Sequence, residues 1–217
     1  MEWASKAGWG RVSGAQTSMP IVVSYFTDAF YQREAFELTR TCQAFALDYM
    51  VERIEDAGSW IGNTNQKPFF LRRMHAQLMD RALLWLDADA RIRRFPKLLM
   101  SLNVPIAYHT WVDGHFPASG TVYLQAGPQR GLLLDEWCRQ VEQGPTLTDQ
   151  ICMGRAVDNL SMSHGELPQD YCWIFDHGED GRSVRTLDPR TYPVIEHMQA
   201  SRYAKDLDQS KKSKVCK

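Results

Sequence analysis

The chain has 217 residues, of which 44% are hydrophobic and 24% are charged, and its formal net charge at pH 7 is −1. This length fits one domain of ordinary size with a sizeable core. The near-zero charge argues against a uniformly basic nucleic-acid binder. No apolar run approaches the roughly 18 residues that a membrane-spanning helix needs.

Cysteine use and the start of the chain indicate the compartment. The five cysteines are odd in number and widely spaced, without the pairing of a metal site, so we expect reduced thiols. The first residues lack the apolar core of a signal peptide. We therefore expect a soluble, cytoplasmic protein with no membrane contact.

The first half of the chain alternates strand and helix patterns. Residues 1–18 are rich in Gly, Ser and Ala without a sustained period, and we interpret them as an N-terminal extension. After them the expected elements are a strand at Ile21–Phe26, a helix through Tyr31 and Phe45, a strand at Tyr49–Ile54, a helix at Lys67–Leu78 and a strand at Ala82–Leu86. This order predicts an α/β fold with a mostly parallel, Rossmann-like sheet flanked by helices.

The second half is less regular and contains no internal repeat. The expected elements are strands at Val104–His109, Thr121–Leu124 and Pro193–His197, and helices at Leu132–Val141 and Asp149–Val157. Thr148 and Asp149 supply a natural N-cap region for the last of these helices. We expect a single domain over residues 19–207, a Gly-rich loop at Gly178–Gly181 and a basic tail over residues 208–217.

Two carboxylates follow the most apolar of these strands. Ala82–Leu86 ends at Asp87 and Asp89. Ligands of parallel α/β sheets sit just outside the carboxyl ends of the strands, so both side chains should emerge where a ligand binds. Oxygen ligands suit Mg²⁺ or Mn²⁺, which commonly carry substrate phosphates. The alternative is a strand that ends in two solvated aspartates.

Taken in order, the motifs resemble those of the GT-A glycosyltransferases, and most closely those of glycogenin-like nucleotide-diphosphosugar transferases with a Leu-Asp-Ala-Asp motif. The likeness runs from about Met19 to Lys205. The motifs that carry it are Pro20–Phe26, Lys67-Pro68, Trp85–Asp89, Phe116–Tyr123, Leu134–Trp137, Thr148–Gln150, Leu167-Pro168 and His197. The chain departs from the family at Ala118–Gly120, where glycogenin-like enzymes have Asn-Ala-Gly, and this leaves the donor sugar open.

The resemblance implies a metal-dependent transfer of sugar from a nucleotide-diphosphate donor, with a UDP-sugar expected, to a hydroxyl acceptor. It implies that Asp87, Asp89 and His197 bind Mn²⁺ or Mg²⁺, and that Asp149 and Gln150 are catalytic. Asp149 serves as general base in an inverting reaction or binds sugar hydroxyls in a retaining one, or else it only caps its helix. The expected donor-binding residues are Tyr25, Thr27, Lys67, Ser119, Gly120, Arg202 and Lys205.

The acceptor stays open between a glycan or small molecule and hydroxymethylated DNA. The DNA alternative, a phage-type enzyme acting on 5-hydroxymethylcytosine, depends on local basic clusters that would neutralise phosphates. These clusters are Arg72, Arg73, Arg91, Arg93, Arg94 with Lys97, and Lys211, Lys212 and Lys214. For each cluster the alternative is a solvated surface. Two further alternatives are a nucleotidyltransferase and an inactive sugar-nucleotide-binding module.

Overall fold

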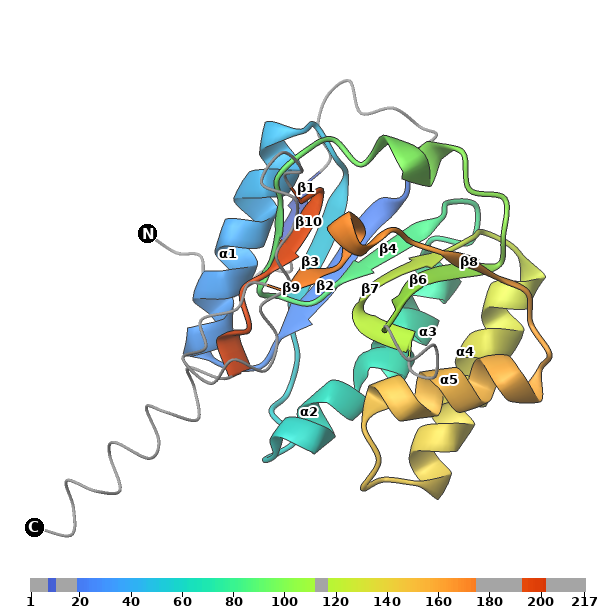
Figure 1. Cartoon of the computed structure of the whole chain (residues 1–217). Helices are drawn as coiled ribbons and strands as arrows, with labels where there is room; N and C mark the ends of the chain where they lie inside the picture. The colour runs from blue at the N-terminus through green and yellow to red at the C-terminus, as the bar shows by residue number, and fades with distance from the viewer. Residues whose placement is uncertain (1–7, 11–18, 112–116, 175–192, 202–217) are drawn as a thin grey trace, which may run out of the picture.

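A central mixed sheet organises the molecule (Figure 1). The computed structural model describes residues 8–10, 19–111, 117–174 and 193–201. Within them, seven strands pair in the order β1-β3-β2-β4-β7-β6-β8. Their bounds are Gly8–Gly10 (β1), Ile21–Phe26 (β2), Tyr49–Arg53 (β3), Leu83–Leu86 (β4), Ile106–Thr110 (β6), Pro117–Leu124 (β7) and His164–Glu166 (β8).

The strand order reverses at β2, and this reversal positions the ligand site. The chain passes from β2 to its parallel neighbour β3, and then returns to pair β4 in parallel on the other side of β2. In open α/β sheets such a reversal opens a crevice at the carboxyl ends of the strands. The ends of β2 and β4 are therefore where the topology places a binding site.

The expected α/β class with one domain is confirmed, although the sheet is more mixed than the pattern predicted. Parallel pairing joins β2 to β3, β2 to β4 and β6 to β8. The pairs of β4 with β7, β6 with β7 and β1 with β3 are antiparallel. Apolar runs predict burial on both faces but not strand direction, which depends on the connections.

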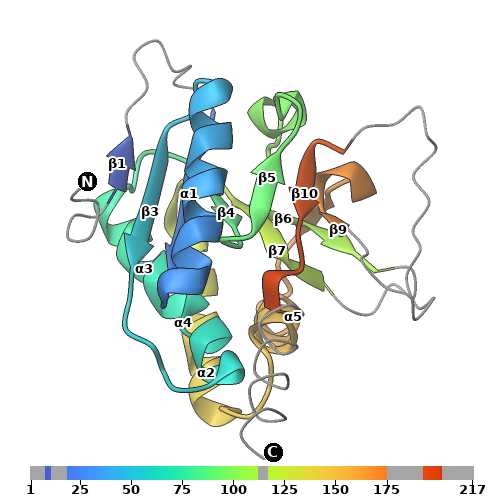
Figure 2. The same cartoon turned by 90° about the vertical axis from the view of Figure 1, so that its left-hand side faces the viewer.

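Helices and a small second sheet cover the two faces (Figures 1 and 2). The helices are Ala29–Ala44 (α1), Trp60–Asn65 (α2), Lys67–Gln77 (α3), Pro128–Gln143 (α4) and Asp149–Asn159 (α5). Alternate β2 residues face opposite layers. Val23 packs in a cluster with side chains of α3, α4 and α5, whereas Val22 packs with side chains of α1. This two-sided packing explains why β2 and β4 have nearly unbroken apolar sequences.

The second sheet brings distant parts of the chain together. Its order is β5-β10-β9, with bounds Ala90–Ile92, Trp173–Ile174 and Ile195–His197 for β5, β9 and β10. Strand β10 runs antiparallel to β5 and places His197 opposite Ala90. The region just after Asp89 is thereby fixed to a segment over 100 residues later in the chain.

Most expected elements occur with shifted ends. Gly8–Gly10, inside the expected extension, pairs with β3 at the sheet edge. The expected strand at Thr121–Leu124 begins earlier, at Pro117, and α4 is longer at both ends than the expected helix. The expected loop at Gly178–Gly181 and the basic tail lie outside the described residues.

Short 3-10 helices at Lys97–Met100 (η1) and Gln169–Tyr171 (η2) complete the described elements. Within the described part of the chain, none of the helices combines the length and the apolar character that crossing a membrane requires.

Candidate active site

A cavity of about 750 Å³ lies at the carboxyl ends of β2 and β4. Ten of the twelve predicted site residues line it, and the roles assigned to them remain predictions. They are Tyr25, Thr27, Lys67, Asp87, Asp89, Ser119, Gly120, Asp149, Gln150 and His197. The other two, Arg202 and Lys205, lie outside the described residues.

Asp87 is held by groups on its own strand and on β7. All four residues of β4 are buried, and the chain reaches the cavity directly after them. The Trp85 indole Nε1 donates to Asp87 Oδ1 at 2.9 Å, and the Asp87 backbone N–H donates to the Gly120 carbonyl at 3.0 Å. These contacts occupy Oδ1 and fix the direction of the carboxylate.

Asp89 is held by the chain that follows β10. The Ala200 backbone N–H donates to Asp89 Oδ2 at 2.8 Å, and the Met198 N–H donates to the Asp89 carbonyl at 3.1 Å. Burial raises the pKa of Asp89, but hydrogen bonds and charge from His197 outweigh it, so the pKa lies below its usual value. Asp89 is therefore held as a carboxylate.

His197 is buried beside both aspartates and is not a surface histidine. Only 4% of the residue is exposed. Its Nε2 lies 2.8 Å from Thr121 Oγ1, and its Nδ1 lies 3.8 Å from Asp89 Oδ1. Burial lowers the pKa of His197, but hydrogen bonds with Asp89 and Cys172 raise it to about 10. Nδ1 is thus the ring nitrogen that faces the carboxylates.

These three side chains fit a divalent cation. One ligand atom from each of Asp87, Asp89 and His197 lies within 4.8 Å of the others. Two carboxylate oxygens and one imidazole nitrogen form a donor set that Mn²⁺ accepts readily and Mg²⁺ accepts through its oxygens. The contact of Thr121 with Nε2 is the kind of outer hydrogen bond that orients a histidine ligand.

The absence of a side chain at Gly120 leaves space for the Asp87 and His197 side chains. A Cβ added to Gly120 would lie 3.0 Å from His197 Cε1, 3.3 Å from His197 Nδ1 and 3.3 Å from Asp87 Oδ2. The backbone of β7 therefore runs directly against the space between the aspartate and the histidine. Gly120 was expected to bind the donor, and the structure also places it against the Asp87 and His197 side chains.

Lys67, which the resemblance predicts to contact the donor, is buried in the cavity wall. Its side chain is only 3% exposed. Its Nζ lies 2.6 Å from Asp149 Oδ2 and 3.2 Å from Asp87 Oδ1, and it donates to the Ser119 carbonyl at 2.9 Å. Burial lowers the pKa of Lys67, but the charges of Asp149 and Asp87 outweigh it and raise the pKa above its usual value. Lys67 is therefore a buried ammonium between two carboxylates.

Asp149 is the first residue of α5 and does not cap it. The N-cap is Thr148, whose side chain accepts from the Ile151 backbone N–H. Asp149 is 4% exposed, and its carbonyl accepts from the Trp137 indole Nε1 at 3.0 Å. Thr148 is therefore the residue that caps the helix, and the alternative in which Asp149 only caps it is wrong. The Asp149 carboxylate faces Lys67.

Tyr25 and Thr27 lie at the end of β2, as the strand pattern predicted. The Tyr25 hydroxyl donates to the Asn63 carbonyl at 2.5 Å, and its ring packs against Phe70 and Trp85. Burial and then the charge of Asp149 raise the pKa of Tyr25 well above its usual value. Tyr25 thus ties β2 to α2 and presents little of its surface to a ligand.

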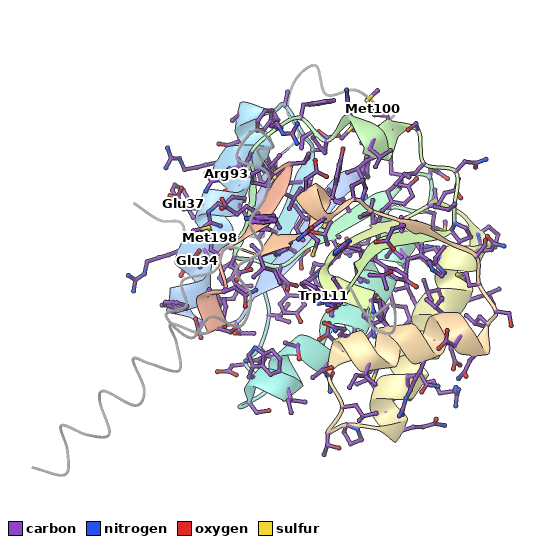
Figure 3. All side chains as sticks on the ribbon, in the orientation of Figure 1. Glu34, Glu37, Arg93, Met100, Trp111 and Met198 are labelled. Atoms are coloured by element: carbon purple, nitrogen blue, oxygen red, sulfur yellow. The ribbon has the colours of Figure 1, made fainter. Side chains whose placement is uncertain are left out.

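Several residues of the cavity wall were not predicted from the sequence. Tyr31, Trp60, Asn63 and Cys172 also line the cavity. Trp111, which directly follows β6, lines it as well. In Figure 3, Trp111 lies at the end of β6 above α5, whereas Met198 lies beyond β10 beside α1. The missed residues come from separate loops and helices and form no local motif, so only the folded chain brings them together.

The arginines proposed for DNA binding are engaged within the protein. Each pairs with a carboxylate of another element: Arg72 with Asp135, Arg73 with Glu52, Arg91 with Glu34, Arg93 with Glu196 and Arg94 with Asp170. Arg91 is itself buried. These pairs offset part of the basic charge near Asp87 and Asp89, although the side chains of Arg72, Arg73, Arg93 and Arg94 are still 43–48% exposed. The lysine tail lies outside the described residues.

Comparison with known proteins shows the fold. No family model and no curated protein sequence matches the chain. A solved glycosyltransferase involved in the glycosylation of the major capsid of PBCV-1 superposes with a TM-score of 0.59 at 10% identity, over 88% of this chain and 99% of that one. The glycosyltransferase GlyE of Streptococcus pneumoniae TIGR4 matches at 14% identity with a TM-score of 0.51, and its apo form at 15% and 0.53. Each GlyE match covers 82% of this chain and 54% of GlyE, so the chain spans about half of that protein. The chain thus has a glycosyltransferase fold.

Proposed function

We propose that this protein is a divalent-cation-dependent glycosyltransferase of the GT-A type that uses a nucleotide-diphosphate sugar, with a UDP-sugar as the expected donor. One observation carries the proposal. A single cavity, at the strand-order reversal of a glycosyltransferase fold, contains two carboxylates and an imidazole within 4.8 Å of one another. Such a cluster is suited to a cation that carries a diphosphate.

In this proposal Asp87, Asp89 and His197 hold Mn²⁺ or Mg²⁺. The cation would neutralise charge on the nucleotide diphosphate as the sugar departs. Thr27, at the end of β2, is 6% exposed and lines the cavity where a nucleotide base and ribose would lie. Arg202 and Lys205 remain proposed phosphate contacts.

Asp149 and Gln150 are the proposed catalytic pair. Asp149 Oδ2 lies 2.6 Å from Lys67 Nζ, so accepting a proton there would cost a buried ion pair. This arrangement supports a role in binding sugar hydroxyls over a role as general base. Gln150 lines the same wall and offers an amide donor and acceptor. Ser119 and Gly120 form the β7 side of the donor-sugar site.

The charge of the described cavity wall favours a neutral hydroxyl acceptor, a glycan or a small molecule. The wall includes Asp28, Asp56, Asp87, Asp89 and Asp149, and its described lysine, Lys67, is already paired with two of these carboxylates. A polyanion would meet net negative charge along these walls. The ion pairs of the arginines point the same way, because they offset part of the positive charge that contacts with DNA phosphates would need.

The test is a donor panel. Nucleotide sugars are incubated with the protein and Mn²⁺, and donor hydrolysis, transfer to glycan acceptors and donor-dependent rise in melting temperature are recorded. Asp89→Asn should lose donor turnover while remaining folded, because it removes ligand charge at nearly constant volume. Asp80→Asn, at an exposed position outside the cavity, is the matched control.

Turnover that persists in excess chelator would overturn the metal dependence. Binding of UDP-sugars without any turnover would favour the inactive binding module, and release of pyrophosphate from nucleoside triphosphates would favour the nucleotidyltransferase. Label transferred to duplex DNA carrying 5-hydroxymethylcytosine, with affinity that falls log-linearly with salt, would restore the DNA acceptor.

A further inference from the structure

The Lys67 side chain divides the acidic wall of the cavity. It begins α3, reaches β7 at Ser119 and α5 at Asp149, and lies 5.1 Å from the centroid of the Trp85 ring. Its Nζ also lies 3.2 Å from Ser119 Oγ. A lysine ammonium has three N–H donors. Its contacts with Asp149, Asp87 and Ser119 engage this ammonium with groups of the protein.

The two carboxylates that Lys67 contacts are close neighbours. Asp87 Oδ1 and Asp149 Oδ2 lie 3.2 Å and 2.6 Å from the same Nζ, so their separation cannot exceed the sum of these distances. Like charges this close are unfavourable unless a cation lies between them, and more so for Asp149, whose side chain is 5% exposed, than for Asp87, whose side chain is 41% exposed. Lys67 supplies that cation as part of the fold.

A divalent cation competes for the same oxygens. Carboxylate oxygens are preferred ligands of Mn²⁺ and Mg²⁺, so an unpaired carboxylate beside the site can enter the ligand set where the geometry allows it. Asp87 belongs to the proposed ligand set, and the Lys67 ammonium contacts both Asp87 and Asp149. The Asp149 carboxylate is therefore close to the proposed ligand set. Without Lys67, the charge of Asp149 would be offset by the N-terminus of α5 and by the cation.

We propose that Lys67 is a positioning residue that keeps Asp149 out of the ligand set of the cation. The ammonium leaves the cation with Asp87, Asp89 and His197 and holds the Asp149 carboxylate for the sugar. This inference rests on the proposed function, since it presumes a cation at the three ligands. It replaces the donor contact expected from the sequence with a role inside the protein.

The experiment measures Mn²⁺ binding by isothermal titration calorimetry without a donor. Lys67→Met removes the charge and retains much of the volume. We expect the variant to bind Mn²⁺ about tenfold more tightly, chiefly because Asp149 joins the ligands. Transfer should nevertheless fall, because Asp149 is no longer held for the sugar. Lys97→Met, at an exposed lysine outside the cavity, should bind Mn²⁺ as the wild type does.

A second variant identifies Asp149 as the cause. In Lys67→Met/Asp149→Asn the additional carboxylate is absent, so Mn²⁺ affinity should return to within about threefold of wild type. This double variant buries a neutral amide in place of an unpaired carboxylate, and it serves as the test if Lys67→Met alone does not fold. A double variant that binds Mn²⁺ tenfold more tightly or more weakly than wild type would overturn the inference.

The outcomes separate this inference from the proposed function. If wild-type protein binds no Mn²⁺, the cation site itself is wrong. If wild type binds Mn²⁺ and Lys67→Met binds it equally or less tightly, only the role of Lys67 is wrong. Unchanged Mn²⁺ affinity together with at least tenfold weaker UDP binding in the absence of Mn²⁺ would return Lys67 to a direct donor contact.

Discussion

Gly120→Ala tests the metal-ligand cluster by a single added methyl group. The new Cβ would lie 3.0 Å from His197 Cε1 and 3.3 Å from Asp87 Oδ2, whereas ordinary van der Waals contact begins at 3.4 Å. The imidazole has little freedom to withdraw, because it is 4% exposed and its Nε2 lies 2.8 Å from Thr121 Oγ1. The methyl group therefore displaces the ring or fills the space beside it.

The expected size of the effect follows from overpacking. Extra methyl groups in a tight site cost about 1–3 kcal/mol. If that strain is relieved only by moving His197 or Asp87 from the binding geometry, Mn²⁺ affinity falls by roughly 10- to 100-fold, since about 1.4 kcal/mol corresponds to a factor of ten. Calorimetric titration with Mn²⁺ measures this change, and urea unfolding of the same samples separates it from a loss of stability.

Gly154→Ala is the matched control. Gly154 lies in α5, where a Cβ would meet only Pro117, at 3.3 and 3.4 Å. Alanine is the better helix former by about 1 kcal/mol, so this variant should be as stable as wild type or more so, with unchanged Mn²⁺ affinity. Wild-type Mn²⁺ affinity in Gly120→Ala would refute the placement of the cation between Asp87 and His197.

Three further predictions address α5 and α4. Thr148→Ala should lower the free energy of unfolding by about 1 kcal/mol, because it removes the cap of α5, and should leave donor binding intact. Asp149→Asn should abolish transfer with donor binding largely unchanged, and normal transfer by this variant in a product assay would contradict its proposed role. Hydrogen bonds from Arg139 lower the pKa of Glu136 from 4.5 to about 2. The ionised Glu136 therefore stabilises the folded protein above pH 4.5, and this stabilisation is lost as the pH falls toward 2. In urea unfolding from pH 6 to pH 2, Glu136→Gln should lose about 1 kcal/mol of this pH-dependent stability. Glu37→Gln, at the exposed pair with Arg40, is the control and should lose clearly less. Equal pH dependence in Glu136→Gln and wild type would show that the Glu136–Arg139 pair contributes nothing.

The sequence by itself determined the features that depend on near neighbours. The apolar runs of β2 and β4 predicted strands buried on both faces, and the packing of Val22 and Val23 into opposite layers explains those runs. The end of β4 then placed Asp87 and Asp89 at the edge of the sheet where ligands bind. Helix periodicity located α1, α3, α4 and α5 to within a few residues, because burial on one face repeats along a helix.

Only the tertiary structure decided which distant groups meet. Pairing of β10 with β5 brings His197 beside Asp89, and the Ala200 N–H reaches Asp89 across 111 positions. Lys67 was expected to contact the donor, but its partners lie on β7 and α5, and no local pattern encodes them. Likewise the arginines near the metal motif form basic runs in the sequence yet pair with carboxylates on other elements. The physical reason is that a charge is satisfied by whatever group the fold places within a few ångströms, and that distance is fixed by strand pairing and helix packing, not by sequence spacing.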